Sequence, residues 1–374
     1  MFVTHLQLVD FRCYRDADIE LRPGVSVFLG ANGQGKTNLL EALVYLATLG
    51  SHRVATDAPL IRAGAERALV RAKIQAGLDD PRQLLAEVEL QLGKANKASI
   101  NRSPLRRVRD VIGSLRVVVF APEDLVIVKG DPADRRRFLD ELATTRWPRL
   151  AAVRAEYERV LRQRSALLKS LAGQYRLGAE AEATLEVWDD SLADFGAELT
   201  AARVATLTDL LPLLAEAYAG LVDVNPGARA SYKSQLDDPG AEPAQLAAAL
   251  KQRMAARRGD ELARGVSLVG PHRDEVLLSL GELPVKGYAS HGESWSFACA
   301  LRLASLGLLR QDGLEPVLLL DDVFAELDQA RREHLAGSVL GAEQVLVTAA
   351  VADDVPSGLS GQRFKVEGGN VSAA

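Results

Sequence analysis

The sequence predicts an α/β fold with two lobes, and three observations support this prediction. A glycine-rich segment at residues 30–37 follows an apolar run at 25–29, typical of a buried strand, and opens an apolar helix at 36–49 that Gly50 closes. A second apolar run, at 316–320, ends in two carboxylates. Between these runs, apolar residues recur mostly at three- and four-residue steps, which indicates a set of packed helices.

The glycine-rich segment fits G-x-x-x-x-G-K-[ST], the phosphate-binding P-loop pattern. Its residues are Gly30, Ala31, Asn32, Gly33, Gln34, Gly35, Lys36 and Thr37. The glycines let backbone N–H groups turn toward phosphate oxygens, and the helix N-terminus adds partial positive charge. Lys36 is predicted to reach the β- and γ-phosphates, and the Thr37 hydroxyl is predicted to bind Mg²⁺. The sequence therefore predicts a site for ATP and Mg²⁺ to which the whole segment contributes.

Two acidic residues, Asp321 and Asp322, follow the apolar run at 316–320. This is the pattern of a buried parallel strand with carboxylates at its carboxyl end. Asp321 is predicted to hold Mg²⁺ with Thr37, directly or through water, and Asp322 to orient or deprotonate the attacking water. Aspartate is one methylene shorter than glutamate, so it reaches that water less favourably. We therefore expect a weak ATPase.

Two shorter segments place the P-loop in a superfamily. Ser290-His291-Gly292-Glu293 precedes an apolar helix at 295–309 and resembles the Ser-x-Gly-[Gln/Glu] signature of the ABC ATPases. Residues 326–328 follow the acidic pair closely and resemble the D-loop. The resemblance implies an ABC-type P-loop ATPase head with an inserted α-helical second lobe. It also implies that Ser290 and Gly292 act on the nucleotide of a second subunit, so that ATP joins two heads in a homodimer.

Four further blocks narrow the resemblance to one family. They are Asp-Phe-Arg-x-Tyr at 10–14, Phe-Ala-Pro-Glu-Asp-Leu at 120–125, Arg-Arg-Arg-Phe-Leu-Asp at 135–140 and Gly-Pro-His-Arg-Asp at 270–274. Together they resemble the RecF family of bacterial DNA replication and repair proteins, which are SMC-like ABC ATPases. The resemblance implies a recombination mediator that binds ATP and double-stranded DNA and dimerises on ATP. It also implies action with RecR and RecO to load RecA at gapped DNA.

The expected organisation is a split head. Residues 1–119 and 265–374 are predicted to form its two parts, and residues 120–264 a mainly helical lobe. Strands are expected at 2–11, at 19–21 and within 69–92, and a further helix is expected at 245–258. Pro148 and Pro212 are expected to break or kink the helices of the lobe. The insertion has no room for the long coiled coils of SMC proteins and no Cys-x-x-Cys hook, which favours a compact DNA clamp.

Composition is consistent with a soluble protein that binds DNA locally. Of 374 residues, 48% are hydrophobic and 25% are charged, and the net charge is −5. An acidic chain can bind DNA only through a local basic patch. The candidates for sequence-independent phosphate contacts are Arg106, Arg107, Arg109, Arg135, Arg136 and Arg137. The last three are consecutive at a helix start, so they cannot all share one face.

The remaining observations concern single residues and location. Arg12 is interpreted either as a nucleotide contact or as a surface arginine at a strand end, and the sequence does not separate the two. The two cysteines, Cys13 and Cys299, form no ligand pattern, so no zinc site is indicated. No signal peptide and no apolar run of transmembrane length are seen, and we expect a cytoplasmic, nucleoid-associated protein without a membrane partner.

Other functions fit the pattern less well. A transporter-type ABC ATPase subunit would need a membrane partner and a histidine after the strand at 345–347, where this chain has Thr348-Ala349-Ala350. A P-loop kinase for a small molecule does not account for the segments at 290–293 and 326–328. Another SMC-like ATPase stays open as an alternative.

Overall fold

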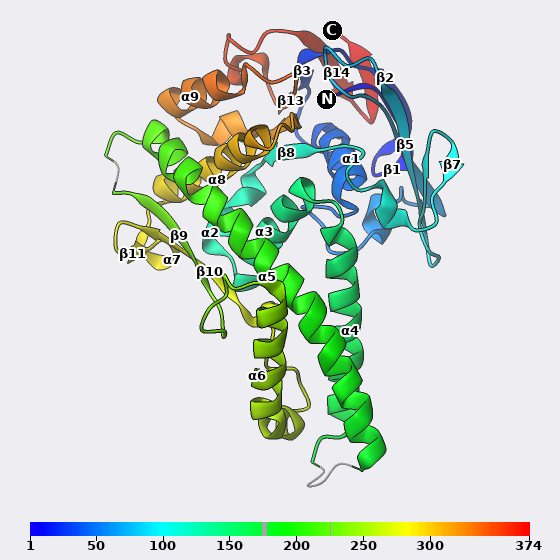
Figure 1. Cartoon of the computed structure of the whole chain (residues 1–374). Helices are drawn as coiled ribbons and strands as arrows, with labels where there is room; N and C mark the ends of the chain where they lie inside the picture. Colours follow the sequence, from blue (N-terminus) through cyan, green and yellow to red (C-terminus); the bar gives the residue numbers. More distant parts are fainter. Residues whose placement is uncertain (174–177, 225) are drawn as a thin grey trace. The chain divides into compact units, whose positions relative to one another are not determined.

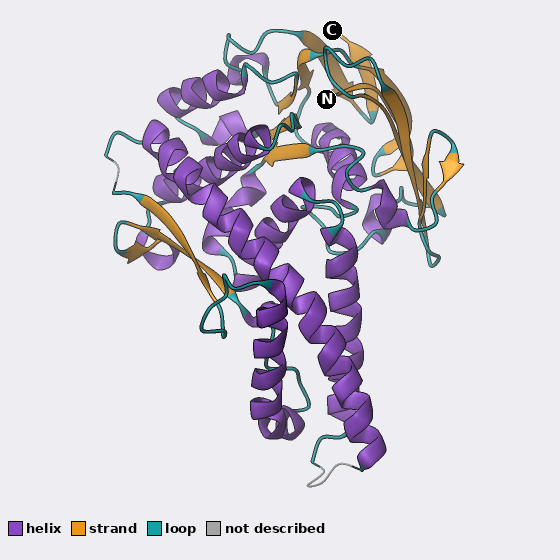
Figure 2. Ribbon diagram, in the orientation of Figure 1, coloured by secondary structure: helices purple, strands orange, loops and turns teal. Residues whose placement is uncertain are grey.

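A computed structural model describes residues 1–173, 178–224 and 226–374 of the chain (Figure 1). The contacts divide the chain into two compact units. The first consists of Met1–Leu125, Leu213–Asn225 and His291–Ala374, and the second of Val126–Pro212 and Pro226–Ser290. The first unit is α/β, and the second is mainly helical with one small sheet (Figure 2). The predicted fold class is confirmed by the relatives described below.

The first unit contains a six-stranded sheet in the order β15-β14-β3-β13-β12-β8. All of its neighbouring strands are parallel except the pair β14–β15. In sheet order, the bounds are Asn370–Ala373, Gln362–Glu367, Gly24–Leu29, Gln344–Ala349, Val317–Asp321 and Val117–Phe120. Every residue of β12 and β13 is buried, because a parallel sheet is covered on both faces. The carboxyl ends of β3, β13, β12 and β8 therefore meet at one edge.

A second six-stranded sheet of the first unit has the order β2-β1-β4-β5-β6-β7 and is antiparallel throughout. The bounds in that order are Tyr14–Glu20, Phe2–Phe11, Arg67–Gln75, Gln83–Gln91, Lys97–Ile100 and Ser103–Pro104. Along β4 and β5, burial largely alternates from one residue to the next, as expected for a sheet with one face in a core. Strands predicted at 2–11 and within 69–92 are thus present, and the strand predicted at 19–21 begins at Tyr14.

Helices α1, α8 and α9 complete the first unit, with bounds Lys36–Thr48, His291–Gln311 and Gln329–Val339. Helix α1 is buried from Leu39 to Ala47, and its side chains share one hydrophobic core with both six-stranded sheets. The helix was predicted to extend to residue 49, but it ends at Thr48, because Leu49 takes a left-handed conformation with φ of 55°. Short 3₁₀ turns lie at Ala58–Leu60, Val108–Val111, Pro122–Asp124, Val323–Glu326 and Ala352–Asp354.

The second unit is built from helices α2 to α6 and a three-stranded antiparallel sheet. The helix bounds are Leu125–Lys129, Pro132–Arg146, Leu150–Ser170, Ala179–Leu221 and Pro243–Arg264. The sheet has the order β11-β10-β9, at Leu283–Pro284, Glu275–Leu280 and Ala228–Lys233, with the short α7 at Val285–Tyr288 and a 3₁₀ turn at Pro271–Arg273. Buried Arg164 joins α4 to α5 and α6 through 2.6 Å contacts with Asp189 and Glu261.

The units differ from the boundaries predicted at residues 120 and 264. The second unit begins at Val126 and continues to Ser290, because β9 lies before α6 in the chain and pairs with β10 after it. The end of helix α5, from Leu213, belongs to the first unit. The second unit is therefore longer than the helical segment predicted from the sequence, because the pairing of β9 with β10 adds residues after α6 to it.

The prolines of the lobe act differently. Pro148 lies in the gap between α3 and α4, as expected for a residue that cannot continue a helix. Of the break or kink predicted at Pro212, the break is wrong, because α5 continues through it to Leu221, and the kink stays a prediction. Proline costs an interior helix one hydrogen bond, and packing on both sides can offset that loss: Leu207, Leu210 and Leu214 around it are buried.

Helix α5 is, by length and composition, long and apolar enough to cross a membrane, contrary to the sequence-based expectation that no such run exists. Its mean hydropathy comes from many alanines and leucines. Core helices pass the same test, so one such helix is weak evidence for a membrane span. In the fold, buried side chains of α5, among them Leu192, Leu199 and Leu210, pack inside the protein.

Candidate active site

The P-loop connects β3 to α1, and its glycines are needed for space as well as for backbone conformation. Gly33 and Gly35 have φ of 81° and 112°, which side chains with a Cβ rarely adopt. A Cβ on Gly35 would lie 2.6 Å from Cys13 Sγ and 2.9 Å from the Tyr14 hydroxyl oxygen. The Tyr14 hydroxyl donates a hydrogen bond to Gly35 O at 3.0 Å. The segment at 10–14 therefore packs directly on the loop.

Lys36 is folded back over the loop that precedes it. Its side chain is buried, and Nζ donates to Gly30 O at 2.8 Å and to Ala31 O at 3.3 Å. The same nitrogen lies 4.0 Å from Asp322 Oδ2. A buried ammonium held by carbonyl oxygens can exchange them for phosphate oxygens, which carry more negative charge. Its position thus fits the phosphate contact predicted from the sequence.

Asp321 and Thr37 meet across the sheet edge. Thr37 Oγ1 donates to Asp321 Oδ1 at 2.9 Å, and Thr348 Oγ1 donates to the same oxygen at 2.6 Å. Burial raises the pKa of the Asp321 carboxyl to about 6, although both hydroxyls favour its ionised form. Carboxylate and hydroxyl oxygens are ligands of the kind that Mg²⁺ takes. The two residues predicted to hold the metal are therefore adjacent.

Asp322 follows in a left-handed conformation, with φ of 47°. Its backbone N–H donates to Thr348 Oγ1 at 2.9 Å, so Thr348 holds both acidic residues. Burial raises the pKa of the Asp322 carboxyl, and the nearby Lys36 ammonium opposes this rise. A raised pKa makes a carboxylate a better acceptor of a proton from water.

Arg12 lies beside the helix of the P-loop. Its guanidinium donates a bidentate pair of hydrogen bonds to the buried Glu41 carboxylate, at 2.8 and 2.6 Å, and a further hydrogen bond to Pro59 O at 3.0 Å. Ser51 Oγ donates to Glu41 at 2.5 Å, and Arg53 lies 3.6 Å from it. Burial raises the pKa of Glu41, but the hydrogen bonds from Arg12 and Ser51 outweigh it and bring the pKa below its ordinary value. The nucleotide contact predicted for Arg12 stays a prediction.

The signature segment opens helix α8. Ser290 and His291 are exposed, and Gly292 faces the Arg331 guanidinium, to which a Cβ on Gly292 would come within 3.6 Å. Arg331 in turn contacts Asp328, whose carboxylate accepts from the Arg331 backbone N–H at 3.0 Å and caps α9. The signature glycine therefore lies next to Arg331, and the aspartate of the D-loop segment begins a helix.

The six candidate arginines for DNA have different surroundings. Arg106 and Arg107 are exposed just after β7, and Arg109 is half-buried. Arg137 is exposed, with Asp134 at 3.9 Å. The exposed guanidiniums of Arg106, Arg107 and Arg137 are compatible with phosphate binding.

The surroundings of Arg135 count against the DNA contact that was predicted for it. Its side chain is buried, and its guanidinium contacts the Glu275 carboxylate at 2.8 and 3.1 Å and Gly130 O at 3.1 Å. Arg136 is also hydrogen-bonded within the second unit, where its guanidinium donates to Asp274 O at 2.7 Å. Burial lowers the pKa of Arg136, as expected for a guanidinium removed from water. Of the three consecutive arginines, Arg137 keeps the exposed position.

The Gly-Pro-His-Arg-Asp block at 270–274 organises the second unit. His272 Nδ1 lies 2.7 Å from the Tyr157 hydroxyl oxygen, and Asp274 Oδ2 accepts from the Tyr232 hydroxyl at 2.8 Å. Buried Arg203 donates to Pro271 O at 2.7 Å. Burial lowers the pKa of His272 to about 4, so this histidine is neutral near pH 7. The block ties β9, α4 and α5 together through buried hydrogen bonds.

Sequence reasoning missed three residues of the site: Tyr14, Glu41 and Thr348. Two left a signal, because Glu41 is a single acid in the otherwise apolar helix at 36–49, and Thr348 is a hydroxyl at the end of an apolar strand. Polar side chains in such buried positions usually have a hydrogen-bond partner, which can belong to a functional site. Tyr14 belongs to the family block at 10–14, but nothing in that block indicated that its hydroxyl contacts the P-loop.

The geometry defines a class of protein. A P-loop and an acidic pair lie at one edge of a parallel sheet, and a signature segment opens α8, as in the ATPase heads of the ABC type. The family model described as RecF/RecN/SMC N terminal domain matches residues 2–358. The sequence-based fold class is thereby confirmed.

Comparison with curated relatives identifies the family. The chain is 57% identical to the DNA replication and repair protein RecF of Cutibacterium acnes, over 100% of this chain and 98% of that protein. It is 56% identical to RecF of Streptomyces avermitilis and 53% identical to RecF of a Nocardioides species, with 99% of each chain covered in both comparisons. The chain therefore belongs to the RecF family of DNA replication and repair proteins.

Solved structures agree with this assignment. The recombination mediator protein RecF of the RecFOR pathway, solved as RecF-ATP, is 26% identical and superposes with a TM-score of 0.89, covering 100% of this chain and 97% of that one. An Smc head domain from Pyrococcus furiosus, 16% identical with a TM-score of 0.56 over 100% of this chain and 96% of that one, shares the fold. The predicted function, a RecF-type role in DNA replication and repair, is confirmed. The transporter and kinase alternatives are set aside.

Proposed function

We propose that this protein binds ATP and Mg²⁺ at residues 30–37, closes with a second copy around double-stranded DNA, and reopens after slow hydrolysis. The observation that carries this proposal is the meeting of Lys36, Thr37 and Asp321 at one sheet edge, with Thr37 Oγ1 2.9 Å from Asp321 Oδ1. Relatives solved as RecF-ATP support the choice of nucleotide. Sedimentation with and without ATP tests the proposal, and a monomer under both conditions would reject it.

Each residue of the site has a proposed task. Backbone N–H groups of the loop and the Lys36 ammonium bind phosphate oxygens, while Thr37 and Asp321 hold Mg²⁺. When bound, the metal neutralises charge on the β- and γ-phosphates. Asp322, whose pKa is raised by burial, accepts the proton of the attacking water. Thr348, through its hydroxyl, holds the Asp321 carboxylate and the backbone N–H of Asp322.

The partners and location follow from the family. We infer that the protein acts with RecR and RecO in loading RecA at gapped or junction DNA, since relatives of 26% identity are named as mediators of the RecFOR pathway. A nucleoid-associated place in the cytoplasm is consistent with that task.

Dimerisation can be tested at the signature segment. Ser290 is exposed and directly precedes α8. We expect Ser290→Arg to bind ATP as the parent does, but to lose ATP-dependent dimerisation and hydrolysis, because the new side chain fills the space of the partner's γ-phosphate. Sedimentation velocity with ATP is the measurement.

A matched control for this test is Ser170→Arg, which places the same side chain at the exposed end of α4. It should dimerise normally. An unimpaired dimer of Ser290→Arg would show that the signature segment does not bridge two subunits.

DNA binding can be tested at the basic segment after β7. We expect Arg106→Ala with Arg107→Ala to weaken binding to all duplex sequences alike, because phosphate contacts carry no sequence information. Each lost contact should reduce the slope of log affinity against log salt by about 0.9. Fluorescence anisotropy across a salt series, with ATP and Mg²⁺, measures both effects.

The control is Arg82→Ala, which removes an arginine of 83% exposure whose charge is already paired with Asp80. It should leave the slope unchanged. An unchanged slope in the Arg106 and Arg107 variant would move the DNA patch elsewhere, with Arg137 the next residue to replace.

A further inference from the structure

We propose that the C-terminal hairpin, formed by β14, β15 and the turn Gly368–Gly369, positions the P-loop for nucleotide, and that Gln34 is the positioning residue through which it acts. The inference rests on the proposed function, since its effect is on ATP binding at residues 30–37. The hairpin lies beyond the residues 2–358 that the family model matches. No role in the site was predicted for it from the sequence.

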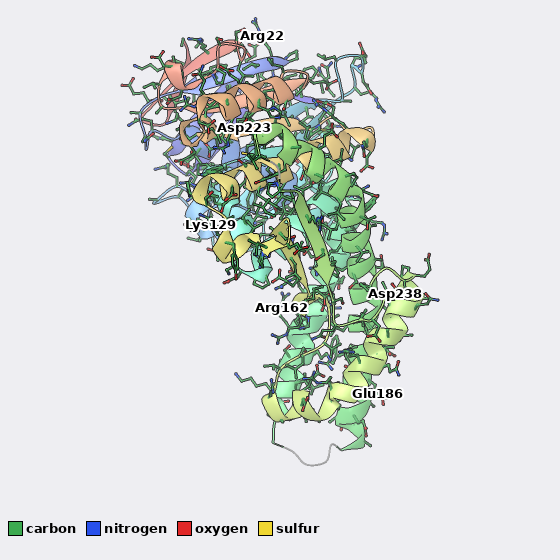
Figure 3. The ribbon with its side chains drawn as sticks, turned by 90° about the vertical axis from the view of Figure 1, so that its left-hand side faces the viewer. Arg22, Lys129, Arg162, Glu186, Asp223 and Asp238 are labelled. Carbon is green, nitrogen blue, oxygen red and sulfur yellow. The ribbon has the colours of Figure 1, made fainter. Side chains whose placement is uncertain are left out.

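Strand register brings the hairpin to the loop. β14 runs parallel to β3, with Phe364 beside Phe28 and Lys365 beside Leu29. The two phenylalanine rings stack at 5.0 Å with an interplanar angle of 14°. At the other end, Gln362 Oε1 accepts from the backbone N–H of Arg22, which Figure 3 labels, at 2.8 Å. Because parallel strands share their carboxyl edge, the residues after Lys365 lie beside the residues after Leu29, which are the P-loop.

The turn donates two hydrogen bonds to one P-loop residue. The Gly368 N–H donates to Gln34 Oε1 at 2.7 Å, and the Gly369 N–H donates to Gln34 O at 3.4 Å. Gln34 is half-buried, whereas Ala31, Asn32 and Gly33 before it are exposed. The hairpin therefore holds the loop at its last residue before Gly35 and Lys36.

The hairpin packs closely against the P-loop, with no space for an added side chain at two glycines. A Cβ on Gly30 would lie 2.2 Å from Val366 O, and a Cβ on Gly369 would lie 2.7 Å from Cys13 O. The segment at Cys13 and Tyr14 itself contacts Gly35. The turn is thus seated against both the loop and the strand end that supports it.

This arrangement makes the loop preorganised. A P-loop binds phosphate only when its N–H groups point inward, and a loop that must first be ordered loses affinity. The hairpin binds the side chain and the carbonyl oxygen of Gln34 on the outer side of the loop. The N–H groups on the inner side are then left to bind phosphate. Weakening the contact should therefore lower nucleotide affinity before it lowers the stability of the fold.

Two glycines of the turn provide a matched pair of variants. Gly368 and Gly369 have φ of 56° and 77°, so alanine is strained at both. The new methyl group would clash with backbone only at Gly369, because a Cβ on Gly368 has nothing within 4 Å. Gly368→Ala also keeps the backbone N–H that donates to Gln34. Gly369→Ala should weaken binding of a fluorescent ATP analogue with Mg²⁺ about tenfold, since a small misplacement of a binding loop has an effect of this order. Gly368→Ala should bind within about twofold of the parent, because the geometry at Gln34 is kept.

A double-mutant cycle tests whether the effect passes through Gln34. Gln34→Met keeps the side-chain length and removes the acceptor of the Gly368 N–H. It should weaken binding severalfold without lowering the Tm, and adding Gly369→Ala should weaken binding by less than the product of the two single effects. A fully multiplicative loss, or equal losses in the two glycine variants, would overturn the inference.

Lys36→Ala separates this inference from the proposed function. If Lys36→Ala loses binding while folded Gly369→Ala and Gln34→Met bind like the parent, the hairpin has no positioning role and the ATP site stands. If Lys36→Ala also binds like the parent, the ATP site itself is rejected and the inference falls with it.

Discussion

Replacing Lys36 with alanine is expected to weaken ATP binding about 100-fold, equivalent to ~2.7 kcal/mol, and to abolish all ATP-dependent behaviour. The ammonium is buried and lies within 3.3 Å of two loop carbonyl oxygens, so its loss leaves phosphate charge without the partner that the loop holds in place. Isothermal titration with ATP and Mg²⁺ measures the affinity. Dimerisation and DNA binding in ATP should fall in parallel.

The variant also removes the donor to Gly30 O and Ala31 O, so its folding must be measured. We expect a small decrease in Tm, because the loop carbonyls can be hydrated when the side chain is gone. Lys94→Ala, which removes a lysine from an exposed turn, is the control and should bind ATP normally. Normal affinity in a folded Lys36→Ala protein would remove the P-loop from the proposed mechanism.

The site was predictable from sequence where one short segment specifies its own geometry. The strand, glycine loop and helix at 25–49 form such a unit, because the glycine positions are required by the backbone itself. The acidic pair could be interpreted because a P-loop precedes it; an apolar strand that ends in Asp321 and Asp322 is weak evidence by itself. The meeting of Thr37 with Asp321 then follows from parallel strands sharing one edge.

What the sequence could not predict depends on partners distant in the chain. Arg135 looks like part of a basic run, yet its charge is paired with Glu275, a residue 140 positions away. Thr348 holds the Asp321 carboxylate and the Asp322 backbone N–H only because β13 lies between β3 and β12 in the sheet. The hairpin turn at Gly368 reaches Gln34 across 334 residues. Local periodicity and composition carry no information about such pairings.

Replacing Asp322 with asparagine is expected to slow hydrolysis about 100-fold while ATP and Mg²⁺ still bind, because a positioned general base commonly contributes a factor of this size. Asparagine tolerates the left-handed conformation that this position requires, with φ of 47°, and it keeps the backbone N–H that donates to Thr348. The change therefore removes the proton acceptor and leaves the turn intact. Dimers formed in ATP should persist longer in proportion, which single-turnover hydrolysis and sedimentation measure together.

The matched variant is Asp321→Asn, at the preceding residue, which ends β12. Asp321 is buried and accepts from two threonine hydroxyls, so the amide should weaken Mg²⁺-dependent nucleotide binding and, through that loss, all later steps. The pair thus separates binding from chemistry: Asp321→Asn should change the affinity, and Asp322→Asn the rate constant at saturating ATP. If Asp322→Asn hydrolyses ATP at the parental rate, Asp322 is not the group that activates water. Glu123, which lies close enough to act on the charges of Asp321 and Asp322, is then the carboxylate to replace.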